Sequence, residues 1–217
     1  MPKLGMEPIR RRQLIVATLA AIHEDGLGET TLARVSARAG LSTGLVNHYF
    51  NGKADLLEAS LRWLAAGLRG EVVTRLAAAR APHDRVLAVI DGNLSPRQFT
   101  PEAVAAWLAF WAEVRAHPRF ARIQRIIARR LESNLLHGLR RLLPAAAARH
   151  AASGLGALID GLWLRCALTE GGVPPAAARA LCRDYLACQI AKAGGAPARS
   201  KDAFHTETHT MEDENER

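Results

Sequence analysis

Apolar residues recur every three or four positions over most of the chain, and runs that alternate apolar and polar residues are almost absent. A spacing of three to four residues places side chains on one face of an α-helix, whereas alternation is typical of a β-strand. Ala and Leu dominate and β-branched residues are sparse, which also favours helices. The pattern predicts an all-α protein of nine helices: 8–25, two short helices within 30–53, then 53–79, 82–93, 101–117, 118–143, 145–170 and 175–193.

The two short helices within 30–53 are joined by a tight turn. Thr30 or Thr31 can cap the first helix and Ser42 the second, because a hydroxyl there accepts a hydrogen bond from a free backbone N–H. Gly40 between them suits the left-handed conformation that ends many helices. The second helix has a small, polar outer face that suits the major groove of DNA, made by Ser42, Thr43, Gly44, Asn47 and His48. An ordinary helical hairpin with a solvated face would show the same pattern.

Basic residues open the first predicted helix. Arg10, Arg11 and Arg12 together favour contacts with DNA phosphates over isolated solvated charges. Asn47 can bond an adenine edge through two atoms, which makes it a candidate for base specificity.

The segment HYFNGKADLL at 48–57 resembles the end of the DNA-binding domain in the TetR family of bacterial repressors. Further segments resemble one branch of that family, the choline-sensing repressors of glycine betaine synthesis, and the likeness covers roughly residues 1–192. The segments that carry it are MPKLGMEPIRRRQLI at the start, DGNLSPRQFTPEAVAAWLAFWAEV at 91–114, RRLESNLLHGLRRLLP at 129–144 and LIDGLWLR at 158–165.

This resemblance implies a ligand-responsive homodimer that binds an inverted-repeat operator and is released by choline. It implies a helix-turn-helix domain at 8–68, a ligand-binding and dimerisation domain at 69–193, and a polar tail at 194–217 that we expect to be disordered. Thr31, Tyr49 and Lys53 would contact phosphates. Asn47 departs from the family pattern, since many members have Tyr there. A regulator of the same family that senses another, possibly cationic, molecule is the alternative.

Aromatic and acidic residues share helix faces in the second half of the chain. Trp107 and Trp111 lie four residues apart, and Asp160 and Trp163 lie three apart. Aromatic faces and carboxylates attract a quaternary ammonium such as choline. Tryptophans at this spacing are usually core residues, so the family resemblance is what favours a cation cage. The candidate ligand-binding residues are Asp91, Trp107, Phe110, Trp111, Glu113, Asp160 and Trp163.

Net charge is +8, and much of the excess lies at 115–149, where nine Arg accompany one Glu; a solvated helix face is the simplest interpretation. Three cysteines without CxxC spacing suggest reduced thiols in the cytoplasm, with no metal site. Arg, Glu or Gly interrupts the longest apolar windows, so we expect no membrane span and a cytoplasmic, nucleoid-associated protein without a cofactor.

A helical enzyme is the alternative from another functional class. The chain has no Walker loop, HExxH or GxSxG motif, and it offers no catalytic residues at recognisable spacing. Gly154, Gly156 and Gly161 would permit close helix approach, and with the last helix they resemble the dimer face of the family.

Overall fold

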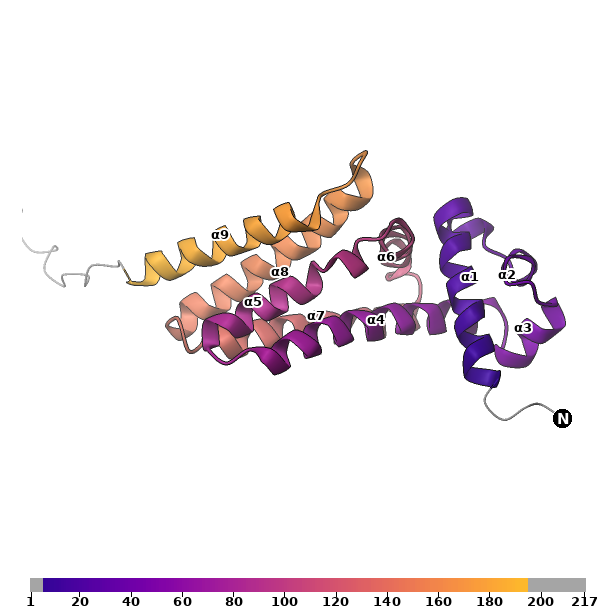
Figure 1. Ribbon diagram of the computed structural model, residues 1–217, viewed down its shortest axis with the longest axis horizontal. Coiled ribbons are helices and arrows are strands. Elements are labelled where there is room, and N and C mark those ends of the chain that lie inside the picture. Colours follow the sequence, from indigo (N-terminus) through magenta and orange to yellow (C-terminus); the bar gives the residue numbers. More distant parts are fainter. Residues whose placement is uncertain (1–5, 195–217) are drawn as a thin grey trace, which may run out of the picture.

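The structure is a computed structural model that describes residues 6–194. Within these residues the chain forms nine α-helices, one short 3-10 helix and no strand (Figure 1), so the predicted all-α class is confirmed. The elements are α1 Met6–Glu29, α2 Leu32–Arg38, α3 Thr43–Tyr49, α4 Lys53–Ala78, α5 Pro82–Asn93, η1 Pro96–Gln98, α6 Pro101–Glu113, α7 Pro118–Leu139, α8 Ala145–Leu168 and α9 Pro175–Gly194.

Helices α1, α2 and α3 gather at one end of the molecule (Figure 1). Their shared core is apolar and almost fully buried, since Leu14, Val35, Val46 and Phe50 are each at most 1% exposed. Burial of this small core fixes the angle between α2 and α3 and leaves the outer face of α3 in solvent.

Helix α4 leaves this end and runs along the long axis of the molecule, where α5, α7, α8 and α9 extend beside it (Figure 1). Helix α6 lies between α1 and this body, and it packs against both α1 and α8. The boundary that the sequence predicted at 68/69 therefore falls inside one uninterrupted helix.

One glycine of α8 permits close approach to α9, as predicted. A Cβ placed on Gly154 would come within 1.9 Å of the Tyr185 hydroxyl oxygen, so a larger residue at this position would displace the Tyr185 side chain of α9. A Cβ placed on Gly156 or on Gly161 would have no other atom of the described chain within 4 Å. These two glycines therefore do not mediate close packing within the described part of one protomer.

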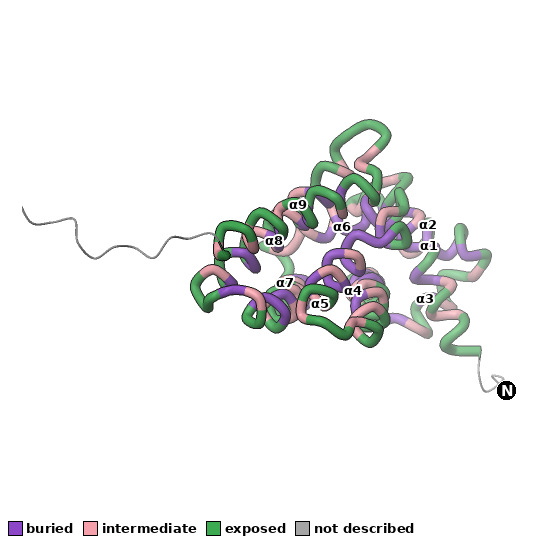
Figure 2. The backbone as a smooth tube through the Cα atoms, turned by 60° about the vertical axis from the view of Figure 1, so that its left-hand side comes forward, coloured by how far each residue is buried: buried purple, intermediate pink, exposed green. Residues whose placement is uncertain are grey.

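Exposed residues are frequent along the last two helices (Figure 2). Large apolar ones are among them: Leu164 and Leu168 of α8 are 43% and 69% exposed, and Leu181 of α9 is 51% exposed. Helix α8 also has the length and mean hydropathy, 1.2, of a helix that could cross a membrane, although only a third of its most apolar stretch is buried. That corrects the expectation that charges interrupt every apolar window: alanines and leucines outweigh Asp160 and Arg165 here.

Most predicted helix limits agree with the structure to within a few residues. Gly26 ends the regular part of α1 as predicted, because its φ of 81° and ψ of 164° are not helical. Helix α1 begins at Met6, two residues before the predicted start at residue 8. Helices α6 and α7 end about four residues earlier than predicted, η1 was not predicted, and residues 195–217 of the expected tail are outside the described range.

Candidate DNA-reading face and ligand cavity

The outer face of α3 is exposed and held at a fixed angle by its caps. The Leu45 N–H donates to the Ser42 hydroxyl at 3.2 Å, and the Thr43 hydroxyl lies 3.1 Å from that of Ser36. Val46 is buried, which turns Asn47 and His48 outward into solvent. The face predicted from the sequence, namely Ser42, Thr43, Gly44, Asn47 and His48, is exposed throughout.

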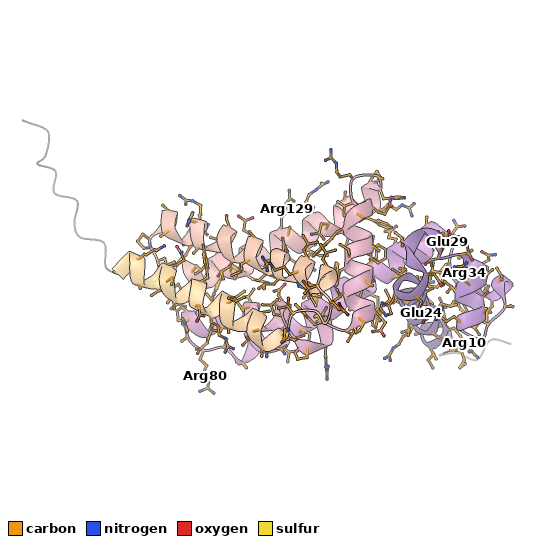
Figure 3. All side chains as sticks on the ribbon, turned by 90° about the horizontal axis from the view of Figure 1, so that it is seen from above. Arg10, Glu24, Glu29, Arg34, Arg80 and Arg129 are labelled. Atoms are coloured by element: carbon orange, nitrogen blue, oxygen red, sulfur yellow. The ribbon has the colours of Figure 1, made fainter. Side chains whose placement is uncertain are left out.

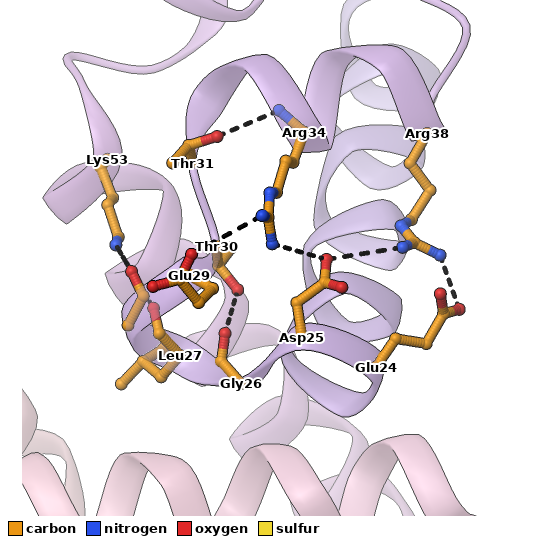
Figure 4. A network of polar contacts seen from close by, with 11 residues as sticks. Glu24, Asp25, Gly26, Leu27, Glu29, Thr30, Thr31, Arg34, Arg38 and Lys53 are labelled. Carbon is orange, nitrogen blue, oxygen red and sulfur yellow. Dashed lines mark hydrogen bonds and ion pairs between the residues drawn. The ribbon is translucent and has the colours of Figure 1, made fainter.

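Two of the predicted phosphate-binding residues also brace this domain. The Arg11 guanidinium donates to the Tyr49 carbonyl oxygen and lies 4.4 Å from the centre of the Phe50 ring, which joins α1 to the end of α3. The Lys53 ammonium donates to the carbonyl oxygens of Leu27 and Gly28 at 3.3 and 3.1 Å (Figure 4). These bonds use only part of the hydrogen-bonding capacity of Lys53 and Arg11, and both side chains keep the positive charge that would attract a phosphate.

Helix α2 is tied to α1 by ion pairs (Figure 4). Arg38 pairs with Glu24 at 2.6 Å and with Asp25 at 3.7 Å, and Arg34 pairs with Asp25 at 3.5 Å. The hydrogen bond that Arg38 donates to Glu24 raises the pKa of Arg38 further above its ordinary value. This network was not predicted, because residues on separate helices were needed to form it.

Thr31 and Arg10 have local partners. The Thr31 hydroxyl accepts from the Arg34 N–H at 3.2 Å and so caps α2 as predicted. Arg10 donates to Gln13, whose own amide donates to the Ala39 carbonyl oxygen at 2.7 Å. Each still lies at or near the surface, on the same end of the molecule as α3 (Figure 3).

A cavity of about 360 Å³ lies in the body between α4, α6, α7 and α8. Three tryptophans line it, and their ring centres are 6.2 to 6.5 Å apart: Trp107 and Trp111 of α6, and Trp163 of α8. This size is within the range of about 300–1,000 Å³ typical of small-molecule sites. The structure therefore brings together all three tryptophans that the sequence proposed for a cage.

Asp160 lines the same cavity, one helical turn before Trp163. Its side chain keeps accessible surface because it faces the empty space, yet the surrounding protein excludes enough water to raise its pKa by desolvation. No cationic side chain is among the described residues that line the cavity. A carboxylate without a cationic partner in such a place is available to a cationic ligand.

Two further polar residues of α7 face this cavity and were not anticipated. Gln124 accepts a hydrogen bond from the Trp111 indole N–H at 3.3 Å, which fixes the orientation of that ring. Glu132 adds a second carboxylate to the lining. Both lie on the long helix whose arginine content made it look like a purely solvated surface element.

Three residues proposed for the cage lie elsewhere. Phe110 packs edge-on against Phe120, with ring centres 5.3 Å apart, and it does not line the cavity, because its side chain leaves α6 about 100° away from that of Trp111. Asp91 pairs with Arg183 at 2.8 Å and with Arg179 at 3.8 Å.

Glu113 pairs with His117 at 3.1 Å near the end of α6. Phe110, Asp91 and Glu113 lie on helices that contribute other residues to the cavity. Their sequence spacing did not reveal which side of each helix faces it.

Comparison with known proteins agrees with both halves of this architecture. A model of the bacterial regulatory proteins of the tetR family matches residues 14–60, and a model of the C-terminal part of BetI-type transcriptional repressors matches residues 82–191. The HTH-type transcriptional regulator BetI 2 of Chromohalobacter salexigens is 49% identical and aligns over 86% of this chain and 91% of its own. The regulator BetI of Escherichia coli K12 is 46% identical and aligns over 86% of this chain and 96% of its own. The chain belongs to the BetI-type repressors of the TetR family.

Solved structures give the same fold. A transcriptional regulator from Pseudomonas aeruginosa PAO1 has a TM-score of 0.70 and 28% identity, covering 87% of this chain and 93% of its own. A transcriptional regulator from Saccharomonospora viridis, solved in complex with choline, has a TM-score of 0.73 and 20% identity. The match covers 83% of this chain and 96% of that regulator. This BetI-type chain is thus a DNA-binding transcriptional regulator and not an enzyme.

In this repressor α4 connects the two sites. Leu68 of α4 lines the tryptophan cavity, while Lys53 at the start of the same helix contacts the end of α1. Glu58 of α4 also binds Arg119 of α7 at 3.1 Å. The hydrogen bond from Arg62, assisted by Arg119, lowers the pKa of Glu58, so this link between α4 and α7 stays charged at neutral pH.

The raised pKa of Asp160 predicts a pH dependence of stability. The folded protein holds this proton more tightly than the unfolded chain, whose Asp has a pKa of about 3.9. The stability that the group contributes is therefore lost as pH rises from that value through the folded pKa. We measure the free energy of unfolding by urea denaturation, without ligand, for Asp160→Asn and for the natural chain. The value for Asp160→Asn minus that for the natural chain should be larger at pH 7 than at about pH 4.

Asp91→Asn is the matched control, because Asp91 has cationic partners outside the cavity. If Asp160→Asn and the natural chain differed by the same amount at both pH values, the carboxylate would not be desolvated in the folded protein.

Proposed function

We propose that this BetI-type repressor senses choline and controls genes for the synthesis of glycine betaine. The observation that carries the proposal is the cavity lined by Trp107, Trp111, Trp163 and Asp160. The names of the relatives and the choline-bound regulator of the same fold support the ligand class.

A quaternary ammonium has no N–H to donate, so hydrogen bonding cannot recognise its charged end. Aromatic faces attract it through the ring quadrupole, and each desolvated contact is worth up to about 2 kcal/mol. The three indole rings supply such faces, and Asp160 supplies the opposite charge. Choline binding would also compensate the cost of ionising Asp160 inside the protein.

We further propose that the repressor acts as a homodimer on an inverted repeat. One recognition helix of seven residues reads only a few base pairs, and two-fold symmetry doubles the site. The exposed leucines of α8 and α9 form an apolar face suited to pairing with a second copy.

Choline would then act through α4. A ligand changes DNA binding only by its different affinity for the DNA-bound and free conformations. A shift of α4 at Leu68 would move the start of the same helix and, through Lys53, the end of α1. In a dimer this would change the separation of the two α3 helices.

Substitutions in and beside α3 should separate base reading from phosphate attraction. Asn47→Ala should reduce the difference in affinity between the operator and unrelated DNA, since its amide is exposed to the groove. Lys53→Ala should weaken binding to all sequences alike and lower the salt dependence of binding. Fluorescence anisotropy with both duplexes at several salt concentrations measures the two effects.

The two variants act as controls for each other, and circular dichroism checks that Lys53→Ala still folds without its bonds to Leu27 and Gly28. A change of preferred bases in Lys53→Ala, with an unaltered salt slope, would show that the roles were assigned wrongly.

Removing one wall of the cage should weaken choline binding. Trp111→Ala should cost roughly 1–2 kcal/mol of choline affinity in titration calorimetry, because a desolvated cation–π contact is lost. Trp63→Ala is the control, since Trp63 is an α4 tryptophan that does not line this cavity. Asp160→Asn should also weaken binding, whereas Glu113→Gln outside the cavity should not. Unchanged choline affinity in Trp111→Ala would leave Trp111 as a packing residue only.

A further inference from the structure

A second cavity, of about 210 Å³, lies between α4 and α7 beside the tryptophan cavity. Leu68, Asn93, Ile127 and Leu131 line both cavities. A single layer of side chains therefore separates them. Leu68 and Leu131 are only partly buried, so a change of rotamer in either can join the two spaces.

The second cavity has the opposite charge to the first. Arg69 of α4 and Arg130 of α7 line it together with Asn134, and no carboxylate is among its described lining residues. Within residues 6–194 neither arginine forms an ion pair. Both residues are solvent-exposed and line the cavity from two different helices, so two guanidinium groups without an ion-pair partner are available there to an anion.

The tryptophan cavity is acidic, with Asp160 and Glu132 in its lining. Successive residues of α7 produce this division: Arg130 lines the second cavity, Leu131 lines both, and Glu132 lines the first. Neighbouring residues on an α-helix differ by about 100° in direction, so Arg130 and Glu132 diverge while Leu131 lies between them.

We propose that the two cavities form one site for a zwitterion, a phosphate ester of choline. The trimethylammonium group occupies the tryptophan cavity, and the phosphate binds Arg69 and Arg130. The inference rests on the proposed cation site and extends it to a larger ligand. The planar forks of two arginines match phosphate oxygens, which accept several charge-assisted hydrogen bonds.

The distance between the quaternary nitrogen and the anionic group of the ligand decides between a carboxylate and a phosphate. In glycine betaine the carboxylate is separated from the nitrogen by one methylene, which is too short to cross a layer of side chains. In phosphocholine an ethylene group and an ester oxygen intervene. A bound phosphate would also bridge Arg69 of α4 and Arg130 of α7, so it would act on the helix that leads to the DNA-binding end.

Titration calorimetry on the full-length protein with phosphocholine, choline and glycine betaine tests this assignment. The double variant Arg69→Gln with Arg130→Gln should bind phosphocholine about tenfold more weakly or worse, since charge-assisted bonds are lost. It should bind choline as the natural chain does, or slightly more tightly. Arg129→Gln is the matched control, because Arg129 carries the same charge on α7 but projects from the outer surface (Figure 3) and lines neither cavity.

The outcomes separate this inference from the proposed function. Choline binding with no phosphocholine binding, or with phosphocholine binding that ignores the two arginines, overturns the zwitterion site and leaves choline sensing intact. Arginine-dependent phosphocholine binding without choline binding supports the zwitterion site and contradicts choline sensing. Tight binding of glycine betaine that depends on the arginines overturns the choice of a phosphate ester.

Discussion

The continuity of α4 is the constraint on which the rest of the structure depends. Its 26 residues span about 39 Å at 1.5 Å per residue, from the DNA-binding end into the body. Lys53 holds its first turn to the end of α1, Leu56 and Leu61 are buried along its length, and Leu68 borders both cavities. Because every turn is closed by backbone hydrogen bonds, the helix moves as a unit. We propose that a displacement at the cavity would reach α1 by this route, and Arg11 of α1 contacts the end of α3.

The carboxylates of the body fall into two kinds, and the difference locates the site. Glu58 and Glu71 are bonded by arginines, chiefly Arg62 and Arg75, which lower the pKa of each and keep it ionised. These two pairs lie within α4, one helical turn apart, and they leave little charge free for a ligand. Asp160 has the opposite shift, since burial raises its pKa and no cationic side chain lines its cavity. A cation that enters satisfies a carboxylate which the protein itself leaves unpaired, and three indole rings replace the water that the cation loses.

Local signals were readable from the sequence, whereas choices between faces of distant helices were not. The hydroxyls of Thr31 and Ser42 cap their helices, in agreement with the prediction of Thr30 or Thr31 and of Ser42, because capping involves residues only three apart. Trp107 and Trp111 share the cavity because four residues make about one helical turn. Asp91 was misplaced because its partners, Arg179 and Arg183, are on α9, far along the chain. Glu132 was overlooked because all of its charged neighbours on α7 are arginines, and the helix was interpreted as one solvated face.

Thermodynamic linkage offers the most direct measurement of whether the cavity controls DNA binding. Choline affinity would be measured by calorimetry for the free protein and for the protein saturated with its operator duplex. If choline releases the repressor through α4, choline binds the operator complex more weakly, by the same factor by which choline weakens operator binding. Equal choline affinities in the two states would contradict this mechanism, because a ligand without differential affinity cannot shift the equilibrium.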